Sequence, residues 1–421
     1  MTVFDDLIGQ DPAILELANA SIAAANLVAG RPVAPGAMTH AWLFTGPPGS
    51  GRSVAARAFA AAVQCDRADE LAARAGVLMA SGDSSSGRRY EPSATPGCGE
   101  CGSCRSVQAG SHPDVRSVIP EGLSIGVNEM RAVVATSARR PSLGRWQVVV
   151  IEDADRLTEG ASNALLKAIE EPPDRTIFLL CAPSTHPDDV IVTIRSRCRV
   201  VALRIPPADA VAAVLVRDGV QPALAEWAAQ AAQGHVGRAR RLARDEQARM
   251  RREAVLAIPA GLTSLNACFE AADHLVKAAE AEAKALTTEL DVSETEELKV
   301  ALGAGGTGKG AAAAARGSAG AIKDLERKQK SRATRLQRDA LDRALVDLAS
   351  FFRDVLLEQA GAGVAAAHPD FARDVASVAK RIDEAGALHR LDQVLACREA
   401  IELNVKPKFA VEAMTVALRL P

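Results

Sequence analysis

The chain has 421 residues, more than one hydrophobic core usually supports, so two or three domains are expected. Apolar residues make up 48% of it and aromatic residues only 3%, and its many alanines favour helices over an all-β architecture. The formal net charge of −2 excludes a global field that would recruit nucleic acid or an anionic membrane, so any such contact requires a local patch.

The sequence shows neither a signal peptide nor a membrane span. The beginning, "MTVFDDLIGQ", lacks the basic and apolar regions of a signal peptide, and no later stretch is long, apolar and uncharged enough to cross a membrane. We therefore expect a cytoplasmic protein with no membrane partner. Three of the eight cysteines fall within seven residues, which in a reducing compartment suits a metal better than disulfides.

The first predicted elements are a strand, a glycine-rich loop and an alanine-rich helix between His40 and Gln64. Residues 66–97, rich in Ala, Gly and Ser, are predicted to form a mobile surface insertion. Further along, helices alternate with the apolar runs "DVRSVI", "WQVVVIED" and "RTIFLLCAP". Thr158 is the predicted N-cap of the helix in "TEGASNALLKAIEEPP", and the double proline ends it. This alternation predicts an α/β domain over residues 1–205, with a parallel sheet covered on both faces.

The remaining chain is predicted to be helical, as a small domain over residues 206–257 and a third domain over residues 258–421. A low-complexity tract, residues 303–320, interrupts the third domain. Its segment "GAGGTGKG" has a lysine at phosphate-loop spacing, but Gly310 replaces the required hydroxyl and no apolar strand precedes it. The basic run from Lys323 to Arg343 is predicted to be a solvated helix face.

The stretch "FTGPPGSGRS", residues 44–53, resembles a phosphate-binding loop with one departure, because Arg52 stands where the pattern G-x-x-x-x-G-K-[ST] has lysine. Its glycines allow successive N–H groups to face a phosphate at the N-terminus of the next helix, and Ser53 offers a hydroxyl to Mg²⁺. These glycines are Gly46, Gly49 and Gly51. Since an arginine fork does not replace an ammonium in catalysis, ATP binding can persist where hydrolysis does not. A glycine turn without a ligand is the alternative.

A second nucleotide motif is an apolar strand that ends in Asp-Glu, of which the first residue organises Mg²⁺ and the second polarises the attacking water. Here the strand ends in Glu152 and Asp153, the reverse order, which should disturb the placement of that water. Two interpretations stay open: a degenerate nucleotide site, or an acidic strand end that holds no metal.

The segment "CGECGSC" places Cys98, Cys101 and Cys104 at the C-x₂-C-x₂-C spacing of a structural zinc site. A closed tetrahedral site needs a fourth ligand. His112 is a candidate, although "HPD" favours a turn that enters a strand. An iron–sulfur cluster is compatible with these ligands, but no redox context accompanies them. The other cysteines are predicted to be buried apolar residues.

The segments "HAWLFTGPPGSGRS", "NALLKAIEEPP" and "IRSRC" together resemble the AAA+ subunits of the bacterial DNA polymerase III clamp loader, over about residues 4–245. The resemblance implies a P-loop type AAA+ domain (1–205) with a zinc module (about 65–104), a helical lid (206–257) and a helical collar (258–421). It implies that Cys65 is the fourth zinc ligand. It also implies a replisome hetero-pentamer with gamma/tau and delta subunits that places a sliding clamp on primer-template DNA.

Within that family the chain resembles the delta-prime kind of subunit more than the gamma/tau motor, chiefly in "SHPDVRSVIPEG" and "IEDADRLTEGASNALLK". In the motor, a G-x-x-R run supplies an arginine that senses the γ-phosphate; here Gly237 stands at that place and Arg238 follows one residue late. A polar sensor residue corresponds to Ser184 or Thr185. The resemblance therefore implies little or no ATPase activity of its own. The alternative is an active motor in which Arg52 serves for the lysine.

The segment "SRC", residues 196–198, matches the family motif intact. Without the family, an arginine at this place would be read as an ordinary surface charge. The resemblance implies that Arg197, together with Ser196, supplies an arginine finger to the ATP site of the neighbouring subunit, where a cation stabilises the transferring phosphoryl group. A different alternative, a zinc-dependent nucleic-acid binder, rests on the cysteine module and the basic run 323–343.

Overall fold

The computed structural model describes residues 2–80, 94–120, 122–301 and 311–421, which form two compact units. The first unit is Met1–Pro120 with Ser124–Ala243, and the second is Arg244–Pro421 with Glu121–Leu123. Residues 206–243, expected in a separate lid, thus pack in the same unit as the sheet. The expected boundary after residue 257 differs from the observed one because a single helix, α11 (Glu246–Gly261), runs through it.

The first unit is built on a five-stranded, fully parallel sheet in the order β2-β3-β4-β1-β5. Its strands are β1 (Ala41–Thr45), β2 (Val115–Val118), β3 (Gln147–Ile151), β4 (Thr176–Ala182) and β5 (Arg199–Ala202). Four of them follow the predicted apolar runs, whereas the edge strand β5 was not predicted. Because β4 lies between β1 and β3, the loops after these three strands meet at one edge of the sheet.

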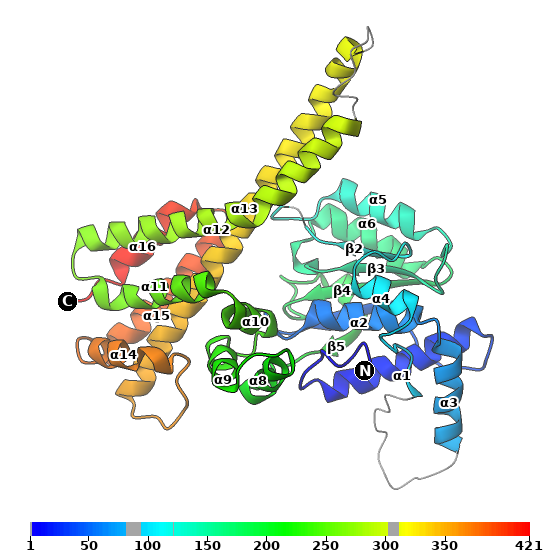
Figure 1. Cartoon of the computed structure of the whole chain (residues 1–421), viewed down its shortest axis with the longest axis horizontal. Coiled ribbons are helices and arrows are strands. Elements are labelled where there is room, and N and C mark those ends of the chain that lie inside the picture. The colour runs from blue at the N-terminus through cyan, green and yellow to red at the C-terminus, as the bar shows by residue number, and fades with distance from the viewer. Residues whose placement is uncertain (1, 81–93, 121, 302–310) are drawn as a thin grey trace. The chain divides into compact units, whose positions relative to one another are not determined.

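Both faces of this sheet are covered, as predicted. Trp42 and Phe44 of β1 belong to one core with α1 and α2, while Leu43 belongs to a second core with α5 and α6. Figure 1 shows these two pairs of helices on opposite faces of the sheet. The helices of this unit that precede β5 are α1 (Asp11–Val28), α2 (Arg52–Gln64), α3 (Ala68–Ala80), α4 (Gly102–Gln108), α5 (Val127–Ser137), α6 (Glu159–Glu170) and α7 (Val192–Arg195), with the 3-10 turn η2 (Ala154–Arg156). The Thr158 hydroxyl accepts the Ala161 N–H at 3.3 Å, so the predicted cap of α6 is confirmed.

The insertion predicted to be mobile begins with an ordered helix. Helix α3 packs against α1, and its Leu71 and Ala72 are buried. Two acidic residues in its first turn, Asp69 and Glu70, stabilise the helix N-terminus. Residues 81–93 of the insertion lie outside the described residues.

Three helices follow the sheet in the first unit: α8 (Ala208–Arg217), α9 (Pro222–Ala231) and α10 (Val236–Arg244), of which the last residue falls in the second unit. Ion pairs connect them to the N-terminal segment. Asp6 pairs with Arg217 at 3.3 Å and with Arg240 at 3.4 Å, and Arg240 also contacts Asp218 at 2.8 Å. These contacts hold α8 and α10 against the residues that precede α1.

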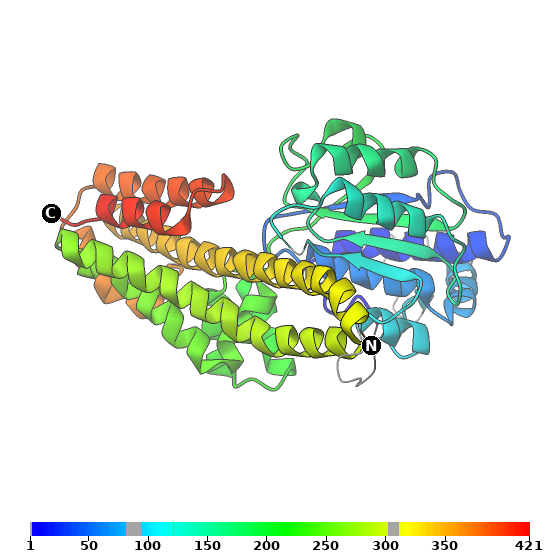
Figure 2. The same cartoon turned by 90° about the horizontal axis from the view of Figure 1, so that it is seen from above.

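The second unit is helical. Its elements are α11, α12 (Leu265–Ala301), α13 (Ala311–Gln359), η3 (Pro369–Phe371), α14 (Ala372–Ala379), α15 (Glu384–Glu402) and α16 (Pro407–Ala417). Helices α12 and α13 pair as a long antiparallel hairpin whose far ends extend beyond the other helices of the unit (Figure 2). Residues 311–320, expected in the low-complexity tract, are the start of α13, which fits the high helix propensity of alanine. Residues 302–310 lie outside the described residues.

A buried polar cluster ties α11 to the loop before η3. His368 is fully buried; its Nδ1 accepts a hydrogen bond from Arg252 Nη2 at 2.9 Å, and its Nε2 lies 3.3 Å from the Asp347 carbonyl oxygen. Arg252 also pairs with Asp370 at 2.5 Å. Burial lowers the pKa of His368, which keeps the imidazole neutral as an acceptor for the guanidinium.

None of the helices in the described ranges is long and apolar enough to cross a membrane.

Candidate functional site

The glycine-rich loop connects β1 to α2, at the edge of the sheet where phosphate loops lie. Gly49 and Gly51 have φ angles of +89° and +92°, which side chains of L-residues rarely adopt. A Cβ atom on Gly49 would lie 2.7 Å from Cβ of His235, the residue just before α10. The loop therefore needs glycine at this position both for its backbone conformation and for its contact with α10.

The N-terminal segment is joined to this loop through Gln10, the residue before α1. The Gln10 amide donates to the Arg204 carbonyl at 2.6 Å and to the Ser50 carbonyl at 3.3 Å, and its oxygen accepts the Arg204 N–H. The buried Ser50 hydroxyl has no hydrogen-bond partner among the described residues. The loop thus retains a polar interior.

Arg52 and Ser53 are the first two residues of α2, as the motif requires. The Arg52 guanidinium turns back over the loop, and its Nη1 donates to the Gly46 carbonyl at 2.9 Å. Gly46 is also joined to the end of β4, because its N–H donates to the Pro183 carbonyl at 3.1 Å. The departure from lysine thus places a planar cation against the loop backbone itself.

The acidic end of β3 lies at the same edge of the sheet. Glu152 pairs with Arg57 of α2 at 3.2 Å, and the Glu152 side chain is only 16% exposed. Asp153 begins the 3-10 turn η2, where its carbonyl accepts the Arg156 N–H. The carboxylate at the expected metal-side position is therefore neutralised by an arginine of the adjacent helix.

The two candidate sensor residues lie in the loop after β4. The Ser184 hydroxyl donates to Asp189 at 2.6 Å, and the Thr185 carbonyl accepts from Arg195 at 3.3 Å. Gly237 and Arg238 both lie in the first turn of α10, where the Arg238 N–H donates to His235 Nδ1 at 3.3 Å. Gly237, which the resemblance aligns with the motor's γ-phosphate-sensing arginine, thus lies in the first turn of α10.

Arg197 and Ser196 follow α7 directly. Arg197 Nη1 donates to the Thr193 carbonyl at 2.9 Å and to the Ser196 hydroxyl at 3.2 Å, and Nη2 pairs with Glu170 at 2.8 Å. The Arg197 side chain is 41% exposed. It is a surface cation held by contacts with α6 and α7.

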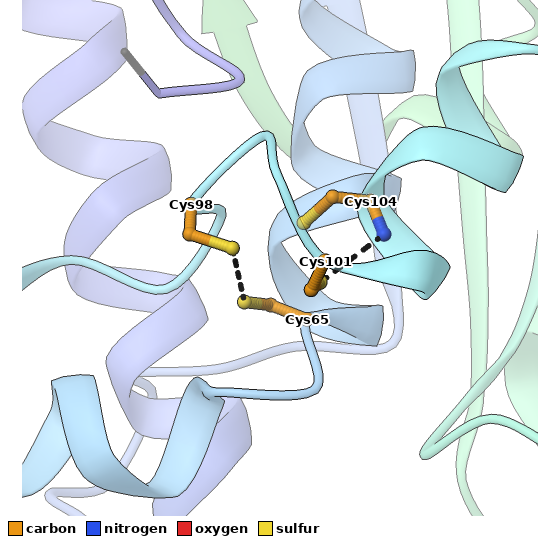
Figure 3. A group of neighbouring side chains, drawn as sticks. All are labelled: Cys65, Cys98, Cys101 and Cys104. Carbon is orange, nitrogen blue, oxygen red and sulfur yellow. Dashed lines mark hydrogen bonds between the residues drawn. The ribbon is translucent and has the colours of Figure 1, made fainter.

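Four cysteines converge beside α2 and α4. The Sγ atoms of Cys65, Cys98, Cys101 and Cys104 all lie within 4.8 Å of one another. Cys65 follows the end of α2, Cys98 and Cys101 lie in the loop before α4, and Cys104 is in its first turn (Figure 3). Their side chains point toward one another, although the chain between Cys65 and Cys98 includes the long insertion. This cluster could hold a structural metal ion.

One pair of sulfurs has the spacing expected for tetrahedral zinc. A zinc–sulfur distance of about 2.3 Å implies sulfur–sulfur distances of about 3.8 Å. The Cys65 and Cys98 sulfurs are 3.8 Å apart. Cys101 Sγ accepts the N–H groups of Asp66 and Cys104, each at 3.4 Å, as a thiolate ligand would.

Hydrogen bonds between the thiols also shift their pKa values. Hydrogen bonding from Cys104 lowers the pKa of Cys65 to about 5, and the same contact raises the pKa of Cys104. The thiolate form is therefore favoured at Cys65 and disfavoured at Cys104. His112 is not among the clustered ligand atoms; its Nδ1 accepts the Asp114 N–H at 3.1 Å, which is the turn that "HPD" suggests.

Comparison with known proteins bears on the first unit. Residues 84–207 match the family model described as "DNA polymerase III, delta subunit". This segment of the chain is therefore similar to subunits of the clamp-loader family. The resemblance inferred from the phosphate loop, the block at α6 and the "SRC" motif is thereby confirmed.

Relatives of the clamp-loader domain are found among both kinds of subunit. The DNA polymerase III subunit delta' of Escherichia coli is 40% identical over 28% of this chain and 35% of its own length, and that of Pseudomonas aeruginosa is 34% identical over 41% and 45%. The subunit tau of Bacillus subtilis is 33% identical over 47% of this chain and 28% of its own length. The chain therefore spans less than half the length of these relatives, and similarity alone does not separate the two kinds.

Among the side chains that contact predicted site residues, Arg57, Glu170 and His235 were not themselves predicted. Glu170 belongs to the block that carries the resemblance, but its contact with Arg197 depends on how α6 and α7 pack. His235 stands beside the degenerate G-x-x-R run. Arg57 lies one turn after Ser53 on α2. Its contact with Glu152 could be predicted only if the position of β3 in the sheet were already known.

Proposed function

We propose that the chain is a clamp-loader subunit of the delta-prime type, which turns over little or no ATP and supplies Arg197 to the ATP site of a neighbouring subunit. In this proposal it assembles with gamma/tau and delta subunits in a hetero-pentamer. That assembly opens a sliding clamp and places it on primer-template DNA. ATP and Mg²⁺ bind weakly or not at all at its own loop.

The observation that carries this proposal is the contrast between the charged residues at the chain's own phosphate loop and Arg197 at its surface. At its own loop, Arg52 bonds the loop backbone and Glu152 pairs with Arg57, so the charges expected for Mg-ATP are used within the chain. Arg197, in contrast, is a surface cation directly after α7. A cation at a subunit surface can stabilise charge that develops on a phosphoryl group bound by a neighbour.

The contacts of the basic run do not favour the nucleic-acid-binding alternative. Arg332 of α13 pairs with Asp291 and Glu294 of α12, and Arg343 pairs with Glu282. The acidic residues of α12 thus offset much of the positive charge that the sequence of α13 suggests. An active motor of the gamma/tau type remains the second candidate, because this chain is also similar to the subunit tau of Bacillus subtilis.

A turnover measurement separates these candidates. The purified chain with Mg-ATP should release phosphate no faster than a Ser53→Ala variant, because the hydroxyl that would hold Mg²⁺ then has no catalytic role. Clear turnover by the chain that Ser53→Ala abolishes would contradict the proposal and favour the motor. Fluorescent-nucleotide binding, measured on the same samples, reports separately whether the loop holds ATP.

The arginine finger is tested in the reconstituted loader. Arg197→Ala should lower the DNA- and clamp-stimulated ATPase rate about 10³-fold at the affected site, since an arginine finger contributes about 10³–10⁵ to kcat. Assembly, measured by size-exclusion chromatography, should be unchanged. Arg195→Ala removes the cation at the end of α7, two residues before Arg197, and serves as the control. An unchanged ATPase rate for Arg197→Ala would remove the assignment.

We also propose that the four-cysteine cluster holds one structural Zn²⁺. The ligands would be Cys65, Cys98, Cys101 and Cys104, and the ion would bind the end of α2 to α4 and the loop between them. The geometry of the sulfurs and the N–H groups directed at Cys101 support this proposal.

A further inference from the structure

The ion pair between Arg197 and Glu170 joins two segments that are distant in sequence. Arg197 Nη2 lies 2.8 Å from Glu170 Oε1, and each side chain is 41% exposed. The other two contacts of Arg197, to the Thr193 carbonyl and the Ser196 hydroxyl, come from its own segment. Glu170 is therefore the contact by which the main body of the domain orients this guanidinium.

The fold places Glu170 firmly. It is the last residue of α6, whose start is capped by Thr158 and whose end is followed by two prolines. The Ile169 carbonyl, one residue before Glu170, is bonded by His40 Nε2 at 2.6 Å, which ties the end of the helix to the residue that precedes β1. The backbone of Glu170 is thus anchored from two sides.

Stability of the fold does not require this pair. Two side chains that are both 41% exposed form an ion pair that solvent and salt screen, and such pairs contribute little to folding. What the pair does supply is orientation, because it restricts a long and flexible side chain to one direction. Orientation matters greatly for a catalytic cation, since displacing a reacting group by 1 Å can lower a rate about 10²-fold.

The contacts also leave donors available. A guanidinium has five N–H donors. Both hydrogen bonds that Arg197 donates within the described residues use Nη1, whereas its contact with Glu170 is an ion pair at Nη2. The Nε–H lies on the same edge of the planar group as one Nη2 hydrogen, the arrangement that binds two oxygens of a phosphate together.

We propose that Glu170 is a positioning residue for Arg197: its carboxylate pairs with Nη2 and holds the guanidinium so that the Nε–Nη2 edge faces the phosphoryl oxygens of a nucleotide bound by the adjacent subunit. This inference rests on the proposed function of Arg197 as a finger acting in trans. It assigns a role in the activity of the assembled loader to a carboxylate that lies outside the "SRC" motif.

The test uses the reconstituted loader with Glu170→Ala and Glu170→Gln, and with Glu171→Gln as a control for removal of an adjacent exposed carboxylate. Glu170→Ala should lower kcat for ATP about tenfold and leave KM for ATP unchanged, because the finger is misplaced while the nucleotide site of the neighbour is intact. Glu170→Gln keeps an oxygen acceptor beside Nη2 and should recover part of the rate. Thermal unfolding and assembly should match the wild type.

A double-mutant cycle distinguishes failure of this inference from failure of the proposed function. If Glu170 acts through Arg197, the double variant Glu170→Ala/Arg197→Ala should be no slower than Arg197→Ala alone. An unchanged rate for Glu170→Ala, while Arg197→Ala is slow, would overturn the positioning role and leave the finger assignment standing. A faster rate for Glu170→Ala would show that the pair sequesters the arginine and would also overturn it. An unchanged rate for Arg197→Ala would remove the proposed function itself.

Discussion

Replacement of one cluster cysteine should release the metal without unfolding the domain core. Cys101 is suited to this change, because it is partly exposed and lies at the start of the short helix α4, whereas Cys65 and Cys104 are buried. In Cys101→Ser the ligand set falls to three thiolates and a weakly acidic hydroxyl. The sulfur that accepts two backbone N–H groups is lost as well.

The size of the effect follows from the number of ligands. Structural zinc sites bind with about 10–16 kcal/mol, so each of four ligands accounts for roughly 2.5–4 kcal/mol. At about 1.4 kcal/mol for each factor of ten, loss of one ligand should weaken zinc binding about 10²–10³-fold. The chelator concentration that removes half of the metal should fall accordingly.

The assay is metal analysis by mass spectrometry, followed by competition with a chromophoric chelator. The wild-type chain should carry one Zn²⁺, and thermal unfolding with chelator should occur at lower temperature than without it, since a metal that binds only the folded state stabilises it. Cys181→Ser, which alters a cysteine buried in the sheet away from the cluster, should keep the zinc. Wild-type protein without stoichiometric zinc, or Cys101→Ser with unaltered affinity, would refute the reasoning.

Two further predictions concern stability. Below about pH 6.5 the free energy of unfolding should fall by up to about 1.4 kcal/mol per pH unit on account of His368, because the unfolded histidine binds a proton that the buried one, with its lowered pKa, resists. In denaturant titrations at several pH values, His368→Gln should reduce this slope, with the exposed His389→Gln as the matched control; equal slopes for the wild type and His368→Gln would disprove the assignment. Gly49→Ala should lower the free energy of unfolding by about 1–3 kcal/mol more than Gly110→Ala does, because both glycines have positive φ but only Gly49 faces His235. Equal decreases for the two variants would exclude a tight contact between residue 49 and His235.

The predictions that held depend on local patterns. Loop glycines, the Thr158 cap and the apolar runs each specify the backbone over a few residues, and the structure forms a loop, a cap and four strands there. The edge strand β5 was missed because it is short and half exposed, so it lacks the continuous apolar run of a buried strand. The start of α13 was missed because its alanines and glycines resemble a linker, although alanine favours helix strongly.

The amino-acid sequence by itself determined the chemical inventory: a phosphate loop with arginine for lysine, a reversed acidic pair, closely spaced cysteines and an intact "SRC" motif. Only the tertiary structure decided which of these groups meet. It pairs Glu152 with Arg57, brings Cys65 to three cysteines across a long insertion, and sets Glu170 against Arg197. The reason is physical. Residue type and spacing govern contacts within a turn or a strand, whereas contacts between distant segments depend on strand order and on which helix faces pack together.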